Sequence, residues 1–441
     1  MNGYGLVWAI PFVGLLSTIA LAPLVAAKLW HRHYRKLVAV WAAAFLAADI
    51  AHEGVSGMLH AVTELLLLDY VPFVLLLGAL FTIAGGLHVT GMPRASAAVN
   101  TALLLLGTLL ASLIGTTGAA MVMLRPLLRA NRHRRQPAHV FIFFIFLVAN
   151  IGGALTPIGN PPIFLGFLLG VPFFWPLLHL ALPAAVLTGF LLAVFYALDT
   201  LIYHRTRHHE PSLVEEIEKL GIHGKVNLVL LALAVAAVLM RTFWHPTTAI
   251  VVLGVPWNLA DIVTDGLFLA TGLLSQALTR PAIRRANEFA WAPMIEVAVI
   301  FAAIFITLVP VMAMIAAGSD GAAAPLIARL FKDGAPVNGA FYWATGALSA
   351  LLDNAPSYVV FFGFAGNDAA HLTGTLARTL AAISAGAVFF GGMTYVGNAP
   401  NFMVKAIVES HGIKMPSFFG YIGWATLCLL PWLAVIAWLF F

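Results

Sequence analysis

Apolar segments long enough to cross a lipid bilayer recur along the whole chain, and they constrain its fold more than any other feature. A spanning helix needs about 20 mostly apolar residues, because each residue rises about 1.5 Å through about 30 Å of hydrocarbon. Such segments lie at 37–51, 71–87, 141–155, 226–240 and 295–317. Only 9% of the 441 residues are charged, which is too few to cover a surface that faces water. We therefore expect an all-α polytopic membrane protein whose solvent is the lipid bilayer.

The positions of the cations predict how the chain lies in the membrane. Lysine, arginine and histidine concentrate in short segments at 28–36, 125–135, 204–225 and 280–285, which the positive-inside rule places in the cytoplasm. No basic stretch precedes the first apolar segment, so the N-terminus is expected outside, and the count of crossings places the C-terminus outside as well. We predict a multi-pass protein of the cell inner (plasma) membrane. Cations confined to such loops also argue against nucleic acid as a partner.

Similar segments in the two halves of the chain indicate an internal repeat. Three pairs are alike and occur in the same order in each half: 112–122 and 349–359, 152–162 and 391–400, and, more weakly, 72–83 and 293–304. The first two pairs are offset by 237 and 238 residues. Three matches in order are difficult to explain by chance, and such repeats are common in secondary transporters.

The repeat and the loop charges together define the predicted domains. Residues 1–203 form the first inverted repeat, 204–225 a cytoplasmic linker, and 226–441 the second inverted repeat, which the linker turns over in the membrane. We count about ten transmembrane helices. The regular pattern is interrupted by two re-entrant helical hairpins, at 97–128 and 340–364, and by two broken helices, at 140–170 and 374–409.

Polar or glycine- and proline-rich breaks occur in these four interrupted segments. Irregular backbone at membrane depth is tolerated only inside protein or beside a water-filled cavity. The oxygens of Thr, Asn and Asp and freed carbonyls suit Na⁺, and the N-termini of half-helices favour anions. We therefore predict that ion or substrate binding involves Thr116, Thr117, Thr156, Gly159, Asn160, Asp353, Asn354, Thr394, Gly397 and Asn398.

Asp353 is the acidic residue of this set, and the pattern places it near mid-membrane. An acid there is costly unless it is paired or solvated, which makes it a candidate functional residue. A carboxylate at this position can hold a cation or a proton in turn, with Asn354 and Asn398 as further cation ligands. Asp before Asn-Ala-Pro also suits a helix N-cap, and capping is compatible with ion binding.

Other polar residues near the ends of spans have simpler interpretations. Asp49 is expected to be solvated at the external end of the second span, and Trp30 is expected to anchor at the membrane interface. Glu296 is either a second titratable site or an interfacial residue, and the interface is favoured. Cys428 is the only cysteine, which excludes a disulfide within the chain.

Three stretches resemble the ion transporter superfamily, which includes the NhaD-type sodium/proton antiporters, the arsenite permeases and the citrate and dicarboxylate transporters. Ser349-Ala-Leu-Leu-Asp-Asn-Ala-Pro356 looks like the Ser-x-x-x-Asp-Asn-x-Pro hairpin of the NhaD type. Asn150-Ile-Gly-Gly-Ala-Leu-Thr-Pro-Ile-Gly159 looks like its Asn-x-Gly-Gly-x-x-x-Pro-Ile-Gly stretch, and 121–129 resembles the end of its first hairpin. The resemblance implies hairpins that meet broken helices, an ion site in each half and, by analogy, a homodimer.

Two positions depart from the NhaD type. That type commonly has Asp-Asn in the first hairpin, where this chain has Gly115-Thr116-Thr117, and it commonly has Asp where this chain has Asn160. The predicted site therefore holds fewer carboxylates. The Asn-Pro and Asn-Ala-Pro breaks also resemble the citrate-type members, whose substrate carboxylates are met by Thr, Asn and backbone amides near bound sodium.

These features predict a secondary active transporter driven by ion gradients, since no nucleotide-binding motif is present. The leading hypothesis is sodium/proton antiport with Asp353 as the exchanging carboxylate. The alternative is a Na⁺- or H⁺-coupled symporter of citrate or another organic anion, for which the sequence indicates no arginine in the core. A channel or metalloid permease is the third class. We expect no enzymatic activity, because no intramembrane catalytic signature is found, and no cofactor, with Na⁺ as the transported or coupling ion.

Overall fold

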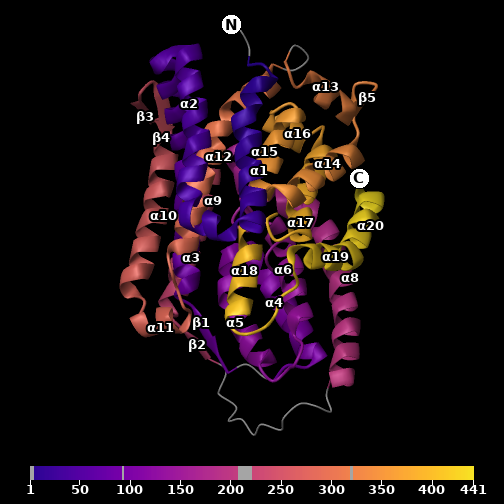
Figure 1. Ribbon diagram of the computed structural model, residues 1–441. Coiled ribbons are helices and arrows are strands. Elements are labelled where there is room, and N and C mark those ends of the chain that lie inside the picture. The colour runs from indigo at the N-terminus through magenta and orange to yellow at the C-terminus, as the bar shows by residue number, and fades with distance from the viewer. Residues whose placement is uncertain (1–3, 92–93, 207–220, 318–320) are drawn as a thin grey trace.

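The computed structural model describes residues 4–91, 94–206, 221–317 and 321–441, and its helices run side by side in an elongated bundle (Figure 1). Within these residues, six helical segments are long and apolar enough to cross a membrane: Leu6–Pro23, Arg32–Gly85, Ala97–Ile114, Trp175–Tyr203, Val226–Phe243 and Ala292–Ala316. The bent pair Phe418–Cys428 and Leu430–Phe440 makes up to seven if it forms one span. The chain is therefore a multi-pass helical membrane protein. The count of about ten spans and the inverted repeats stay predictions.

The elements divide at residues 207–220, which lie outside the described residues and include most of the predicted linker. The first half contains η1 (Leu6–Ala9), α1 (Ile10–Val25), α2 (Ala27–Leu65), the π-helix η2 (Leu66–Tyr70), α3 (Val71–Gly85), β1 (His88–Thr90), α4 (Ala97–Ile114), α5 (Thr116–Asn131), α6 (Ala138–Leu147), η3 (Ile151–Ala154), α7 (Pro161–Leu168) and α8 (Trp175–Thr206). The second half contains β2 (Gly221–His223), α9 (Val226–Phe243), β3 (Ala249–Val252), β4 (Val255–Asn258), α10 (Leu259–Leu278), α11 (Pro281–Ala286), α12 (Ala292–Ala316), α13 (Ala324–Ile327), η6 (Ala328–Leu330), β5 (Phe331–Lys332), β6 (Ala335–Pro336), α14 (Asn338–Leu351), α15 (Asn354–Phe364), α16 (Ala369–Thr373), α17 (Ala377–Phe390), η7 (Gly391–Met393), α18 (Ala399–Ser410), α19 (Phe418–Cys428) and α20 (Leu430–Phe440).

Three short antiparallel strand pairs lie toward the ends of the bundle. β1 pairs with β2, β3 with β4, and β5 with β6. The β3–β4 and β5–β6 pairs lie toward the end of the bundle that carries the N-terminus, and β1–β2 lies toward the opposite end (Figure 1). Because β1 follows α3 and β2 precedes α9, the β1–β2 pair joins the two halves directly.

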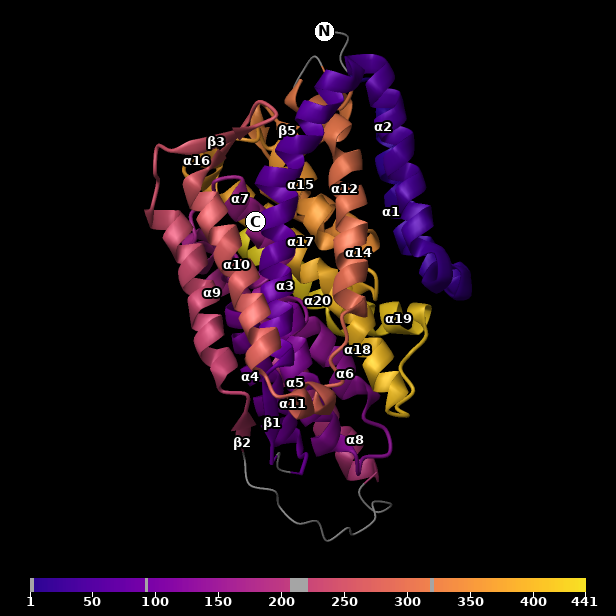
Figure 2. The ribbon, with the colours of Figure 1, turned by 90° about the vertical axis from the view of Figure 1, so that its left-hand side faces the viewer.

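Helix α2 is broken at one glycine. Gly54 has φ 76° and ψ 171°, a conformation that only glycine adopts without penalty. The chain changes direction there, and the limb after Gly54 leads through the π-helix into α3 (Figure 2). The predicted spans 37–51 and 71–87 are therefore joined by helical backbone instead of a loop.

Several cations that were expected in short cytoplasmic loops lie on helices. Residues 28–36 are part of α2, and Arg125 and Arg129 are part of α5. The loop assignment of Arg125 is wrong, since this residue is only 7% exposed. The physical reason is that α5 continues past its apolar part to Asn131, so its last cations face protein.

A buried ionic group fixes the base of α4 and α5 to α8. Asp199 on α8 is 0% exposed and forms an ion pair with Arg134. Its carboxylate also lies 2.8 Å from His139 Nε2 and accepts a hydrogen bond from Asn100 Nδ2 at 3.2 Å. Because removing one partner of such a group leaves a buried charge unpaired, these contacts hold one end of the first helix pair in place.

Candidate substrate and ion site

The two broken helices restart with the same local geometry. Asn160 precedes α7 with φ −149° and ψ 143°, and Asn398 precedes α18 with φ −159° and ψ 139°. Each restarted helix has at least one proline within its first two positions, Pro161 and Pro162 in α7 and Pro400 in α18. Proline is well tolerated there because the first turn of a helix has no internal partner for that backbone N–H. The two Asn-Pro-type sequences therefore build equivalent helix starts.

A pair of touching glycines closes each break. A Cβ atom on Gly159 would lie 2.4 Å from the carbonyl oxygen of Gly153, and one on Gly397 would lie 2.7 Å from that of Gly391. No side chain fits at either position, so both breaks fold into compact turns. The first turn is also held by the backbone N–H of Thr116, which donates to the Gly159 oxygen at 2.8 Å.

Threonine side chains tie each break to the neighbouring helix pair in the same way. Thr156 donates a hydrogen bond to the Ser112 carbonyl on α4, and Thr394 donates to the Ala350 carbonyl on α14 at 2.6 Å. In each half the donor lies 44 residues after the acceptor. Because both hydroxyl protons are donated to backbone carbonyls, the two threonines hold the breaks in position against α4 and α14.

A network of buried asparagines connects the two halves. Asn150 Nδ2 donates to Asn401 Oδ1 at 2.8 Å, and its Oδ1 accepts from Asn398 Nδ2 at 3.2 Å. Asn354 Nδ2 donates to Asn160 Oδ1 at 3.1 Å. All five side chains are at most 2% exposed. Since buried amides are costly when unpaired, this network fixes the register of the two breaks against each other.

Asp353 occupies the junction between α14 and α15. Its Oδ1 accepts a hydrogen bond from the backbone N–H of Ala355 at 3.0 Å, and its carbonyl accepts from Ser357 Oγ at 2.6 Å. The capping interpretation of Asp353 is thus confirmed. The first helix pair turns at Gly115 instead, which has φ 77°, so the two tips differ by one carboxylate.

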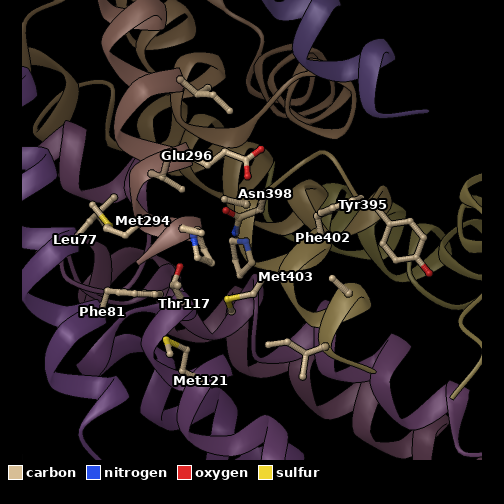
Figure 3. A pocket seen from close by; sticks show the side chains of 18 of the residues that line it. Leu77, Phe81, Thr117, Met121, Met294, Glu296, Tyr395, Asn398, Phe402 and Met403 are labelled. Atoms are coloured by element: carbon tan, nitrogen blue, oxygen red, sulfur yellow. The ribbon is translucent and has the colours of Figure 1, made fainter. Parts of the chain in front are cut away.

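A cavity of about 410 Å³ opens beside these tips and breaks (Figure 3). Three of the ten predicted site residues line it, namely Thr117, Asp353 and Asn398. The other seven lie behind them in the turns and hydrogen bonds described above: Thr116, Thr156, Gly159, Asn160, Asn354, Thr394 and Gly397. Much of the remaining wall is apolar and flexible, with Met121, Met294 and Met403 facing the space (Figure 3).

One face of α5 contributes two polar side chains and a methionine to the cavity. Thr117, Met121 and Arg125 all line it, and their spacing of four residues places them above one another on a helix. Arg125 Nη2 lies 3.3 Å from Glu288 Oε2, with 8% of the Arg125 side chain and 57% of the Glu288 side chain exposed. The guanidinium therefore belongs to the cavity, with a partner that water can reach.

The charges that line the cavity are unbalanced. Arg125 is its one cation among the described residues, and Asp353, Glu288 and Glu296 are its acids. Glu296 Oε1 accepts a hydrogen bond from Trp30 Nε1 at 3.2 Å. Because excess negative charge in a partly enclosed space attracts cations, an anion that enters this cavity gains from cations or protons that accompany it.

Some polar residues lie in other surroundings than the sequence predicted. Glu296 lines the cavity, which agrees with its alternative interpretation as a second titratable site, and Trp30 is 3% exposed, which does not fit an anchor that faces the membrane interface. Asp49 is 2% exposed and accepts from Tyr4 Oη at 2.8 Å, so its expected solvation is also wrong. The spacing of Thr117 and Arg125 on one helix face is the signal that could have found the arginine.

Asp353 has a further oxygen atom beside it that no group of the described residues satisfies. Among the described residues, no three His, Cys, Asp or Glu side chains converge to hold a metal ion. Asn354 Oδ1, next to Asp353 in the chain, is buried and has no hydrogen-bond partner. One carboxylate with neutral oxygens makes a weak site, and weak binding suits an ion that must leave again.

Comparison with known proteins places the chain in a family. No curated protein matches it. The model of the family CitMHS_2, described as "Putative citrate transport", matches residues 1–441. A match over the whole chain covers both broken helices and both helix pairs of the site. The chain therefore belongs to this citrate transport family.

Proposed function

We propose that the protein is a secondary transporter that carries a citrate-class organic anion together with Na⁺ or H⁺. The observation that carries this proposal is the cavity, which brings Arg125 together with Asp353, Thr117 and Asn398. The sequence had indicated no core arginine for an anion carrier, and Arg125 supplies one. The family match to citrate transport supports the same substrate class.

Two kinds of group favour a carboxylate substrate in the cavity. The Arg125 guanidinium presents a planar fork of N–H donors that matches a carboxylate. Its present partner Glu288 is 57% exposed, so a substrate carboxylate can replace it at little cost. The N-terminal ends of α5 and α18 also reach the cavity through Thr117 and Asn398, and helix N-termini favour anions.

Coupling to a cation follows from the acids of the cavity. A citrate-class anion adds negative charge to a space that already holds three carboxylates and one guanidinium. We assign the coupling ion to Asp353, with Asn354 and Asn398 as neutral ligands. We further propose that the protein lies in the plasma membrane with both termini outside. In the same proposal, residues 1–203 and 226–441 form inverted repeats, and two copies of the chain form a homodimer.

Sodium/proton antiport is the second candidate, and Asp353 favours it. A carboxylate that lines a cavity rich in acids can exchange one proton for one Na⁺ without any anion. The two candidates differ in a measurable way. Antiport requires proton movement driven by Na⁺ alone, whereas symport requires uptake of the anion.

The deciding experiment measures flux in proteoliposomes with a trapped pH dye. Pulses of Na⁺, Li⁺ and K⁺ are applied first, and labelled citrate is added afterwards. Citrate uptake that depends on Na⁺ or on a pH gradient, without a response to cations alone, supports the proposal. A pH change driven by Na⁺ alone and lost in Asp353→Asn establishes the antiporter instead. Absence of both fluxes contradicts both candidates.

A further inference from the structure

A second set of buried charges lies outside the cavity, where α9, α10 and η2 meet. Arg241 Nε near the end of α9 lies 3.0 Å from Asp261 Oδ1 in the first turn of α10. Asp265 follows one turn later and is 3% exposed, and neither of its carboxylate oxygens has a hydrogen-bond partner. None of these residues lines the cavity.

The groups around Asp265 do not neutralise it. Helix α10 packs against α3, α9 and β4. The sequence of α3 and β4 carries no titratable side chain, and α9 carries only Arg241. Arg241 is shared, because Asp261 is already its ion-pair partner and Asp69 on η2 and Glu64 on α2 add further negative charge nearby. Asp265 is therefore a buried carboxyl without a cation of its own.

Two further polar atoms at this place are also unsatisfied. The hydroxyl of Thr264, which is 0% exposed, has no hydrogen-bond partner, and Arg241 Nη1 is buried without an acceptor. Asp69 lies on the π-helix Leu66–Tyr70, and such segments recur at functional sites. Unsatisfied buried polar groups are uncommon in folded proteins, and several of them in one place point to a functional role.

The positive charge that Asp265 needs is better supplied by a proton than by a metal ion. A metal site requires several converging oxygen or nitrogen ligands, and the described residues contain no group of three His, Cys, Asp or Glu side chains suited to this. One proton on one carboxyl oxygen removes the charge without any further ligand. An ionised Asp265 would instead attract the free Arg241 Nη1.

We propose that Asp265 is a proton-binding site of this transporter, separate from the cavity, whose ionisation draws Arg241 from Asp261 toward Asp265. Proton uptake from water converts the carboxylate to a neutral carboxyl, and release returns the proton to water. The Arg241–Asp261 ion pair at the start of α10 is therefore intact when Asp265 is protonated and broken when Asp265 is ionised. This site extends the proposed function and does not depend on the identity of the transported anion.

Infrared difference spectroscopy on the purified full-length protein in lipid nanodiscs tests the site directly. As the pH is stepped from about 6 to about 9, the wild type is expected to lose a C=O stretch of a buried carboxyl. Asp265→Asn should lose the part of this signal that comes from Asp265, whereas Asp353→Asn should keep that part. An Asp265→Asn signal as large as that of the wild type, or a wild type without any such signal, would overturn the proposal. Asp353→Asn separates this result from the fate of the cavity hypothesis.

A thermal unfolding series provides a second readout. A proton held by folded Asp265 and absent from the unfolded chain stabilises the fold at low pH, and this stabilisation is lost as the pH rises. The folding equilibrium of the wild type should fall relative to Asp265→Asn by up to about tenfold per pH unit. The control Asp261→Asn removes the competing carboxylate, so Arg241 can pair with ionised Asp265 and the loss of stability with rising pH should be smaller than in the wild type. If Asp265→Asn fails to fold, Asp265→Glu should shift the infrared signal; an unshifted signal would contradict the proposal.

Discussion

The side-chain amide of Asn354 donates a hydrogen bond to Asn160 Oδ1 at 3.1 Å, and this contact joins the start of α15 in the second half to the start of α7 in the first. Asn150 donates in the opposite direction, from the first half to Asn401 Oδ1 in the second half at 2.8 Å. Each half thus supplies amides that satisfy the other at the centre of the molecule. The cavity lies beside this junction, so its geometry depends on both halves.

The Asn150–Asn401 pair should be strongly coupled. Replacing either residue by alanine leaves a buried amide without its partner, and we expect each single variant to lose about 1–3 kcal/mol of stability. The double variant should lose less than the sum of the two, by about 0.5–3 kcal/mol. Thermal unfolding of the four proteins measures this difference. Strict additivity would show that the 2.8 Å contact contributes nothing specific.

Arg125→Gln should weaken citrate uptake. A charge-assisted hydrogen bond to a carboxylate contributes about 1.5–3 kcal/mol, so KM should rise roughly 10- to 100-fold. Glu288→Gln is the matched control, because it frees Arg125 from its present partner and should leave KM equal or lower. Concentration series in proteoliposomes give both values. If KM is unchanged in Arg125→Gln, Arg125 does not contribute to substrate binding.

Asp353→Asn separates the charge of this residue from its capping role. Asparagine caps a helix about as well as aspartate, so the variant should fold with nearly unchanged stability. Ion coupling should be lost, because the carboxylate is gone. Asp353→Ala should lose both the coupling and about 1 kcal/mol of stability. Flux and thermal unfolding are measured on the same preparations. If Asp353→Asn keeps ion coupling, the Asp353 carboxylate does not bind the coupling ion.

Gly159→Ala and Gly397→Ala should both be destabilising. The added Cβ would meet a backbone carbonyl oxygen at 2.4 Å or 2.7 Å, and a backbone atom in a closed turn cannot rotate away. We expect losses of about 1–3 kcal/mol from overpacking. Gly189→Ala on α8 is the control, since no atom lies within 4 Å of the added Cβ, and it should gain up to about 1 kcal/mol. Similar stability for all three variants would contradict the tight turns.

The membrane class was predictable from the sequence because the composition alone requires lipid as solvent. The interrupted segments were also visible, because glycine, proline and asparagine at these positions leave few alternatives to a break in the helix. Gly54 shows the limit of this reasoning, since the segment between the predicted spans 37–51 and 71–87 is helical on both sides of a break at this one glycine. The spacing of residues along a helix shows which of them share a face. It does not show which neighbouring helix that face packs against.

Arg125 and Glu296 show why the cavity itself was harder to predict. Both acquire their role only when α5, α12 and α18 come together, and the sequence separation between Arg125 and Glu288 is 163 residues. The positive-inside rule placed Arg125 in a cytoplasmic loop, because cations that follow an apolar segment usually lie outside the membrane. Asn150 and Asn401 were overlooked as partners for a similar reason, since neither has an asparagine at the equivalent position of the other half.

The asparagine network also has a consequence for biosynthesis. Asn354 is synthesised 194 residues after Asn160, and Asn401 is synthesised 251 residues after Asn150. At about 5–20 residues per second, this delay is roughly 10–50 s. Lipid offers no substitute hydrogen bonds during that time, so the nascent first half has to remain beside water or the insertion machinery. The synthesis of Asn354 and Asn401, rather than the insertion of the first span, is then the step that commits the chain to its native core.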